Sequence, residues 1–347
     1  MIAPMRLLVS AAIAAVALAA AHRPAAAQPD ALAERFVEHL NESGGAGPAA
    51  YRRLWNVMDS LVLRELGRGK DAEAVNRALA ALPGFAGATD GDGVAIGRGV
   101  FYSEVPRALP GYVVLPVRAG GETLLLGVYN FGVSSPGRMS LFARRGGSWR
   151  RTGVADATAT IVPYLLPLAD SGLAVVTLDT FTGADHQTGS ARAWRVRRGM
   201  LELLRTAGTE MKEPEARAAN RAVRISFTRR PRNLEVANLG TRTGYVTTLS
   251  PAGATVAVAT EVVTPWVDVV DQYYGLARRT PARARALLAS PALAARLGSR
   301  MPYAHDDGGD LRAGTGWVVL EAGERRYRVT SRRGAGGQWR ITAVEPQ

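Results

Sequence analysis

Residues 124–153 read LLLGVYNFGVSSPGRMSLFARRGGSWRRTG, and residues 173–208 read LAVVTLDTFTGADHQTGSARAWRVRRGMLELLRTAG. In each stretch an apolar run ends at a phenylalanine, Phe131 or Phe181, and a polar loop follows. A second run with one inward aromatic residue then leads through a basic glycine turn into a third run. Short apolar runs separated by turn residues are typical of β-hairpins. The two stretches, which lie about 50 residues apart, therefore predict a repeated antiparallel unit.

The same pattern continues on both sides of the repeat, from about residue 94 to residue 261. No long helical pattern interrupts it, which predicts an antiparallel β meander. A fainter third copy covers residues 223–261. Residues 124–261 resemble consecutive blades of a β-propeller, in which each unit is a four-stranded meander. The repeat leaves three arrangements open: a meandering sheet, a sandwich and an incomplete propeller.

The chain before the meander, residues 28–93, has helical spacing instead. Leu54, Met58 and Leu61 belong to one apolar stripe that begins after Pro48 and ends at Gly67. Pro in the first turn and Gly at the end are typical helix boundaries. A helix before this stripe and another opened by Asp71 complete the predicted N-terminal segment.

The last region, residues 262–347, predicts a small α+β domain. Pro265 starts a helix, Thr280-Pro281 and Ser290-Pro291 are start signals for two more, and Gly298 is a stop. A polar loop, residues 303–315, is expected to lead to three antiparallel strands, the last of which reads QWRITAVEP. This order of elements is similar to the cystatin-like or nuclear-transport-factor-like module, whose members range from enzymes to scaffolds.

Residues 1–27 have the three parts of a secretory signal. Arg6 supplies the positive charge, residues 7–21 are apolar, and Ala25-Ala26-Ala27 precede Gln28. We therefore expect cleavage after Ala27 and a soluble periplasmic or secreted protein with no transmembrane span in its mature part. The chain contains no cysteine, which excludes disulfides, a thiol nucleophile and cysteine-ligated zinc.

The 347 residues are 47% hydrophobic and 21% charged, which excludes a disordered chain and a polytopic membrane protein. The formal net charge is +13, and all but two of the 43 basic residues, Lys70 and Lys212, are arginines. The excess of arginine indicates either binding to phosphate or carboxylate groups or a GC-rich coding sequence.

No complete catalytic motif occurs in the sequence, so whether the protein is an enzyme stays open, with a non-catalytic role preferred. The catalytic candidates are Asp179, Asp185 and His186, which lie in or beside the polar loop of the second repeat. Imidazole and carboxylate groups that meet on one loop could form an acid–base pair or bind a metal.

A second polar cluster and several arginine groups are the remaining candidates. His305, Asp306, Asp307 and Asp310 are candidate metal ligands, because hard divalent cations bind carboxylates. No cofactor is predicted. The candidate anion-binding residues are Arg195, Arg197, Arg198, Arg229, Arg230 and Arg232.

The sequence thus predicts an α+β protein with N-terminal helices, a central β meander and a small C-terminal domain. We expect an exported bacterial envelope protein that acts as a binding or scaffold module. One alternative is a periplasmic hydrolase or metal-dependent enzyme built around Asp185 and His186. Another is a binder of anionic glycolipid or polysaccharide through arginine-rich faces. Its partners would be such envelope components or another envelope protein, and nucleic acid is not expected.

Overall fold

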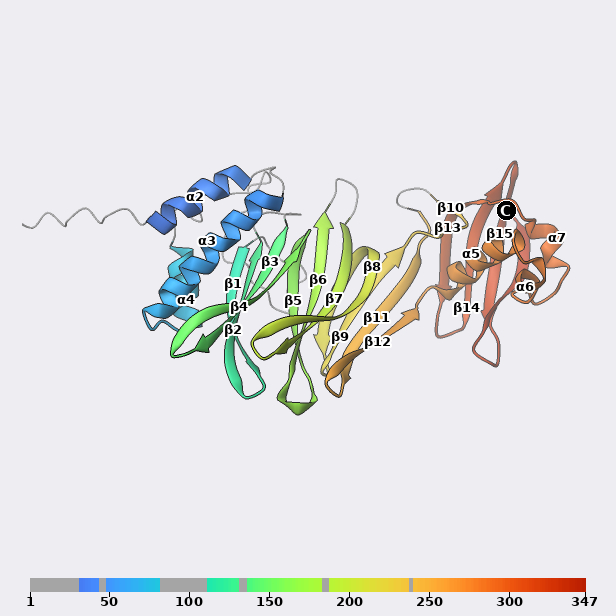
Figure 1. Ribbon diagram of the computed structural model, residues 1–347. Helices are drawn as coiled ribbons and strands as arrows, with labels where there is room; N and C mark the ends of the chain where they lie inside the picture. The colour runs from blue at the N-terminus through green and yellow to red at the C-terminus, as the bar shows by residue number, and fades with distance from the viewer. Residues whose placement is uncertain (1–30, 44–47, 82–110, 131–135, 183–186, 237–239) are drawn as a thin grey trace, which may run out of the picture.

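The computed structural model describes residues 31–43, 48–81, 111–130, 136–182, 187–236 and 240–347. The predicted signal segment, residues 1–27, lies outside these ranges. Figure 1 shows an elongated α+β arrangement. The N-terminal helices occupy one end, two antiparallel sheets follow, and a third sheet with its own helices forms the other end.

The N-terminal layer has the three helices that the spacing predicted. They are α2 (Ala31–Ser43), α3 (Pro48–Gly67) and α4 (Ala72–Ala80). The apolar residues Phe36, Leu61 and Val75 are buried, as the stripe requires. Asp71 caps α4, because its carboxylate accepts a hydrogen bond from the backbone N–H of Ala74 at 2.8 Å.

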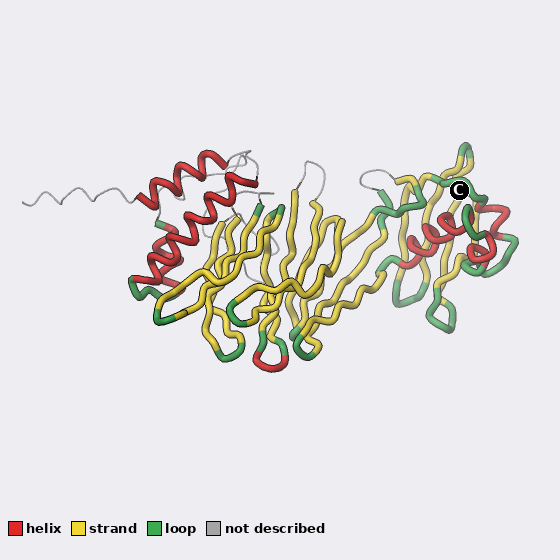
Figure 2. Tube along the Cα trace, viewed as in Figure 1, coloured by secondary structure: helices red, strands yellow, loops and turns green. Residues whose placement is uncertain are grey.

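The first sheet is a four-stranded antiparallel meander in the order β1-β2-β3-β4. Its strands are β1 (Gly111–Ala119), β2 (Glu122–Asn130), β3 (Gly137–Arg145) and β4 (Ser148–Ala157). The helices lie on one face of this sheet (Figure 2). There Tyr129 and Phe142 of the sheet share a buried core with Leu54 and Met58 of α3.

The second sheet has seven antiparallel strands in the order β12-β11-β9-β8-β7-β6-β5. These are β5 (Thr160–Pro167), β6 (Leu173–Thr182), β7 (Gln187–Arg197), β8 (Met200–Ala219), β9 (Ala222–Arg229), β11 (Thr243–Ala252) and β12 (Thr255–Val262), with a 3-10 turn η1 (Ala169–Ser171) after β5. The register of β8 shifts against both of its neighbours. Glu210 and Glu213 within it have φ values of 56° and 48°, in the left-handed region. Such bulges bend a strand, and the sheet curls until the Tyr164 hydroxyl reaches the carbonyl of Ala216 at 3.3 Å.

Strand β6 is buried on both faces, which explains why its sequence is an almost continuous apolar run. Val175 packs toward the first sheet, in a core that includes Leu126 and Leu141. Val176 points the opposite way, into the core enclosed by the curled second sheet, where it joins Ile225.

The C-terminal unit consists of three helices and a five-stranded sheet in the order β10-β13-β14-β15-β16. The helices are α5 (Pro265–Ala277), α6 (Pro281–Arg285) and α7 (Leu293–Leu297). The strands are β10 (Glu235–Val236), β13 (Tyr303–Asp310), β14 (Thr315–Ala322), β15 (Arg325–Arg333) and β16 (Trp339–Pro346). Val270 and Tyr274 of α5 share a buried core with Val318 and Leu320 of β14.

Three features of this architecture correct the sequence predictions. The third copy, residues 223–261, continues the second sheet instead of forming a blade of its own. Residues 303–310 form strand β13, where a loop was expected. The C-terminal sheet is not wholly antiparallel, since β10 pairs with β13 in parallel.

The start signal at Ser290-Pro291 was also misplaced. Helix α7 begins at Leu293, and Ala292 occupies the N-cap position without a side-chain hydrogen bond. The stop at Gly298 is confirmed, because this residue has φ 67° at the end of the helix.

Candidate functional site

A pocket of about 660 Å³ opens at the end of β6, beside the start of β7, the bulged part of β8 and the segment that follows β9. This is the upper end of β6 in Figure 1. Its size is within the usual range for small-ligand pockets. The lining residues are Thr158, Ala159, Asp179, Phe181, Thr188, Gly189, Ser190, Glu210, Lys212, Arg229, Arg230, Pro231 and Arg232.

Gly189 allows the bulged strand to pass close to β7 here. A Cβ atom at this position would lie 2.7 Å from Cγ of Pro214 and 3.1 Å from the carbonyl oxygen of Asp179. Both distances are too short for ordinary contacts, so only glycine fits. The close approach brings the β8 residues Glu210 and Lys212 to the pocket wall.

The buried acid of the pocket is held by an arginine on the neighbouring strand. Arg192 of β7 donates from Nε to Oδ2 of Asp179 at 2.7 Å, and its Nη2 contacts the same oxygen. Asp179 is only 4% exposed. Burial raises the pKa of Asp179 above its ordinary value, although the Arg192 guanidinium acts in the opposite direction. The ion pair fixes this end of β6 against β7.

Four cations surround the same pocket, and their charges are not neutralised in this way. Arg229 lies over the rings of Phe227 and Tyr245, 5.1 and 5.3 Å from their centroids. Arg230 donates to the carbonyl of Val236 at 2.7 Å. In the described part of the chain, neither these two nor Lys212 and Arg232 form an ion pair with a carboxylate.

The pocket therefore carries an excess of positive charge. Of its two acids, Asp179 is neutralised by Arg192, which leaves Glu210 against four cations. Arginine forms paired hydrogen bonds with carboxylate and phosphate groups. The electrostatics of the pocket favour an anionic group.

The remaining walls combine an apolar surface with hydroxyl groups. The ring of Phe181 is 50% exposed, which is unusual for a phenylalanine. Thr158, Thr188 and Ser190 place hydroxyl groups on the lining. A ligand with both an anionic and a less polar portion would find a partner for each.

The structure brings together two sets of residues that the sequence analysis treated separately. Asp179, a catalytic candidate, and the anion-binding candidates Arg229, Arg230 and Arg232 line one pocket. Asp185 and His186 lie outside the described residues. Arg195, Arg197 and Arg198 do not line the pocket; the first two belong to the opposite end of β7, and Arg198 lies in the turn that follows it.

Sequence reasoning missed the contribution of β8 to this site. Lys212 and Glu210 lie in a part of β8 where bulges interrupt the regular alternation of side chains between the two faces of the sheet. Which face each side chain is on therefore cannot be predicted from the sequence. One signal was available, since Lys212 is one of only two lysines in an arginine-rich chain.

The candidate metal ligands on β13 each contact a different partner. His305 Nε2 contacts Oε2 of Glu321 at 2.8 Å. Asp307 accepts a hydrogen bond from the indole of Trp266 at 3.2 Å, and Asp310 accepts one from the backbone N–H of Arg312 at 2.7 Å. Asp306 accepts one from the N–H of Asp307 at 2.9 Å. Among the described residues there is no group of three or more acidic or histidine side chains that could hold a metal ion.

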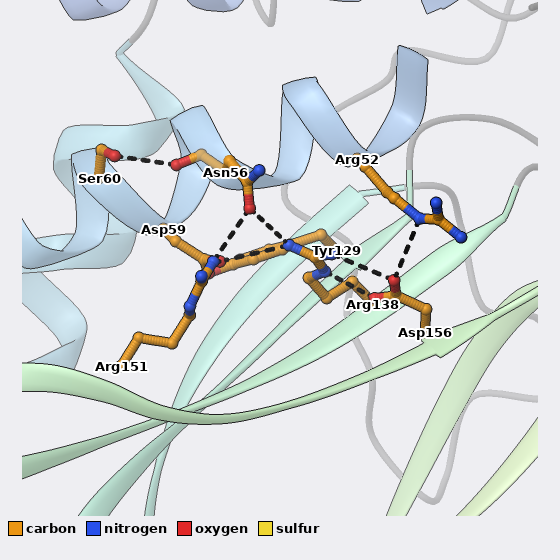
Figure 3. Close-up of polar contacts among 8 residues, drawn as sticks. All are labelled: Arg52, Asn56, Asp59, Ser60, Tyr129, Arg138, Arg151 and Asp156. Atoms are coloured by element: carbon orange, nitrogen blue, oxygen red, sulfur yellow. Dashed lines mark hydrogen bonds and ion pairs between the residues drawn. The ribbon is translucent and has the colours of Figure 1, made fainter. Parts of the chain in front are cut away.

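A different group of polar residues, centred on Asp59 and Arg138, lies between helix α3 and the first sheet (Figure 3). Arg138 of β3 binds both oxygens of Asp156, with distances of 2.7 Å and 3.1 Å. It also donates to the side chain of Asn56 at 2.9 Å and lies 3.6 Å from Asp59. Its guanidinium covers the ring of Trp55 at 4.9 Å.

The other members of this cluster complete the coordination of Asp59. The Tyr129 hydroxyl donates to Oδ1 at 3.0 Å, and Arg151 contacts Oδ2 at 2.5 Å. Burial raises the pKa of Tyr129 well above its ordinary value, and the nearby Asp59 adds to the effect. Because the two carboxylates are matched by arginines, we interpret this cluster as a link between the helical layer and the sheet.

Comparisons with known proteins give no indication of what this chain does. No protein-family model matches the chain, and no curated protein matches it. None of the described helices is long and apolar enough to span a bilayer.

Proposed function

We propose that the mature chain is an exported binding protein whose pocket between β6, β8 and the 229–232 segment holds an anionic group of its ligand. Export rests on the signal predicted in residues 1–27. The observation that supports binding is the excess of unneutralised cations around one pocket. A phosphate or carboxylate group would meet Lys212 and Arg232, the two cations for which no hydrogen bond within the described chain competes.

A binding role agrees with how the buried acid is used. Asp179 gives one of its oxygens to both donors of Arg192, an arrangement that stiffens the pocket wall. A rigid wall lowers the entropy cost of binding, because fewer side chains have to be ordered. The alternative of a hydrolase around Asp185 and His186 stays a prediction.

The ligand class can be tested by calorimetric titration of residues 28–347. Inorganic phosphate and glucuronate supply the two anionic groups, and glucose is the neutral counterpart of glucuronate. We expect at least one anion to bind in a salt-sensitive way and glucose to bind far more weakly.

A matched pair of variants locates the binding. In Lys212→Gln/Arg232→Gln the affinity should fall by at least about tenfold, since hydrogen bonds to charged groups are the stronger ones. Arg283→Gln/Arg325→Gln removes the same charge from exposed positions of the C-terminal unit and should leave the affinity unchanged. Binding of neither anion, or equal binding by the pocket variant and the wild type, would refute the proposal.

A further inference from the structure

Two hairpin tips meet at the end of β7 and β8 that lies away from the pocket. One is the turn between β3 and β4, at Gly146-Gly147, and the other is the turn between β7 and β8, at Arg198-Gly199. Arg145 donates from Nη2 to the carbonyl of Arg198 at 3.3 Å. A Cβ on Gly199 would lie 2.6 Å from that same nitrogen, so the turns are in direct contact.

The paired tips carry positive charge, most of which is not balanced by a carboxylate of the described residues. Arg145 is paired with Glu122 at 3.3 Å. Arg144, Arg197 and Arg198 are exposed, and none of them has a carboxylate partner within the described residues. Arg144 instead lies over the ring of Trp149 at 5.5 Å.

The same tip exposes an apolar side chain. Met200 follows the turn directly and is 56% exposed, the highest value among the large hydrophobic residues described. It pairs with Arg197 across the hairpin, so the two side chains emerge on the same face. Arg144 and Arg145 approach from the other hairpin.

From this juxtaposition we propose that the paired β3–β4 and β7–β8 tips dock on the surface of a bilayer that contains anionic phospholipid. Arginines near such a surface are attracted to its phosphate groups. An exposed methionine beside Arg197 gains by entering the boundary of the acyl chains. A soluble polyanion would use the arginines but would give Met200 no favourable environment, so the apolar residue favours lipid.

The test is co-sedimentation of residues 28–347 with vesicles. One set contains only phosphatidylcholine, and the other contains about 30% phosphatidylglycerol, enough to give a negative surface potential. We expect binding to the anionic vesicles alone, with loss of binding at high salt. Absence of binding to the anionic vesicles would overturn the proposal.

Three variants separate the contributions. Arg197→Gln/Arg198→Asn should weaken vesicle binding by about 30-fold; asparagine is chosen because Arg198 has φ 50° and asparagine tolerates that region. Met200→Ser should weaken it by about fivefold. The control Arg283→Gln/Arg325→Gln should bind like the wild type.

The outcomes of the variants decide between partners. Full binding by the double-arginine variant would overturn the proposal. If Met200→Ser bound vesicles like the wild type while soluble polyphosphate competed fully, the partner would be a soluble polyanion and the lipid proposal would fall. The pocket variant Lys212→Gln/Arg232→Gln should still bind vesicles, so failure here and failure of the proposed function remain distinguishable.

Discussion

The indole of Trp266 lies directly on the backbone of β14, and this contact sets the side-chain size allowed there. A Cβ on Gly316 would lie 2.3 Å from Cδ2 of the ring, while the indole N–H donates to Asp307 at 3.2 Å. Gly316→Ala must therefore displace the ring from a packed core. We expect a loss of about 1–3 kcal/mol in the free energy of unfolding, measured with urea.

A matched control lies 20 residues further along the chain, in the same unit. Gly336 has no atom within 4 Å of a built Cβ and no positive φ. Gly336→Ala should change the free energy of unfolding by less than about 0.5 kcal/mol. Equal effects of the two substitutions would mean that the indole does not restrict Gly316.

Glu65 gives a second prediction at the residue scale, with a defined pH dependence. Burial acts to raise the pKa of Glu65, but hydrogen bonds from Lys70 and Arg64 outweigh it, so the pKa is lowered. A lowered folded-state pKa stabilises the protein above the unfolded-state value, and this contribution is lost as the pH falls through the folded-state value. Glu65→Gln should thus cost about 1–3 kcal/mol at neutral pH, and the difference should shrink below about pH 4.

The neighbouring helix supplies the control for this pH profile. Glu73 pairs with Arg77, but both side chains are more than half exposed, at 77% and 61%. Exposed pairs contribute little, so Glu73→Gln should cost less than about 0.5 kcal/mol at any pH. A pH-independent effect of Glu65→Gln would contradict the role given to its charge.

At the scale of secondary-structure elements, the polar residues around Asp59 and Arg138 (Figure 3) join α3 to the first sheet. Asp59→Ala would leave Arg138 with a buried charge and one acid fewer to balance it. Loss of one partner of a buried ion pair costs about 3–5 kcal/mol, whereas replacement of both by apolar residues is often nearly neutral. We expect Asp59→Ala/Arg138→Met to be more stable than Asp59→Ala alone in urea unfolding. A double variant less stable than the single one would show that the arginine stabilises the fold without Asp59.

The elements themselves were largely predictable, because their signals are local. Helix α3 begins at Pro48 and ends at Gly67 as expected, and the hairpins of both repeats form. The two-residue strand β10 was not predicted, since its pairing with Tyr303 and Ala304 depends on contacts far apart in the sequence. The sequence likewise gave no indication that Arg138 lies close to Asp59, because the two residues belong to different elements.

The candidate site, too, was only partly predictable from the sequence. Asp179 lies near the end of an apolar strand, and Arg229, Arg230 and Arg232 lie close together in the chain, so both could be found from the sequence. That they share a pocket depends on the bulges of β8 and on the curl of the second sheet. Backbone conformations such as the positive φ of Glu210 and Glu213 have no residue signature, because glutamate rarely adopts them.

At the scale of the whole molecule, the buried cores divide the chain into two parts. The C-terminal core contains only residues from Leu234 onward, whereas the other three cores end at or before Val258 and include none of its members. The two parts are joined where Gly244 donates to Thr264 Oγ1 at 2.6 Å and where β10 crosses to β13. Among the described residues, contacts between the two parts are few compared with those within each part, so we expect two transitions in calorimetric unfolding.

Two fully buried leucines can assign these transitions. Leu320 belongs to the C-terminal core and Leu141 to the core between the first two sheets. Substitution of either by alanine removes about 2–5 kcal/mol from the unit that contains it. Leu320→Ala should lower only one transition, by roughly 10 °C, and Leu141→Ala should lower only the other. If each variant lowered both transitions, or if a single transition moved in both, the junctions at Gly244–Thr264 and at β10 would be enough to make the whole chain fold as one cooperative unit.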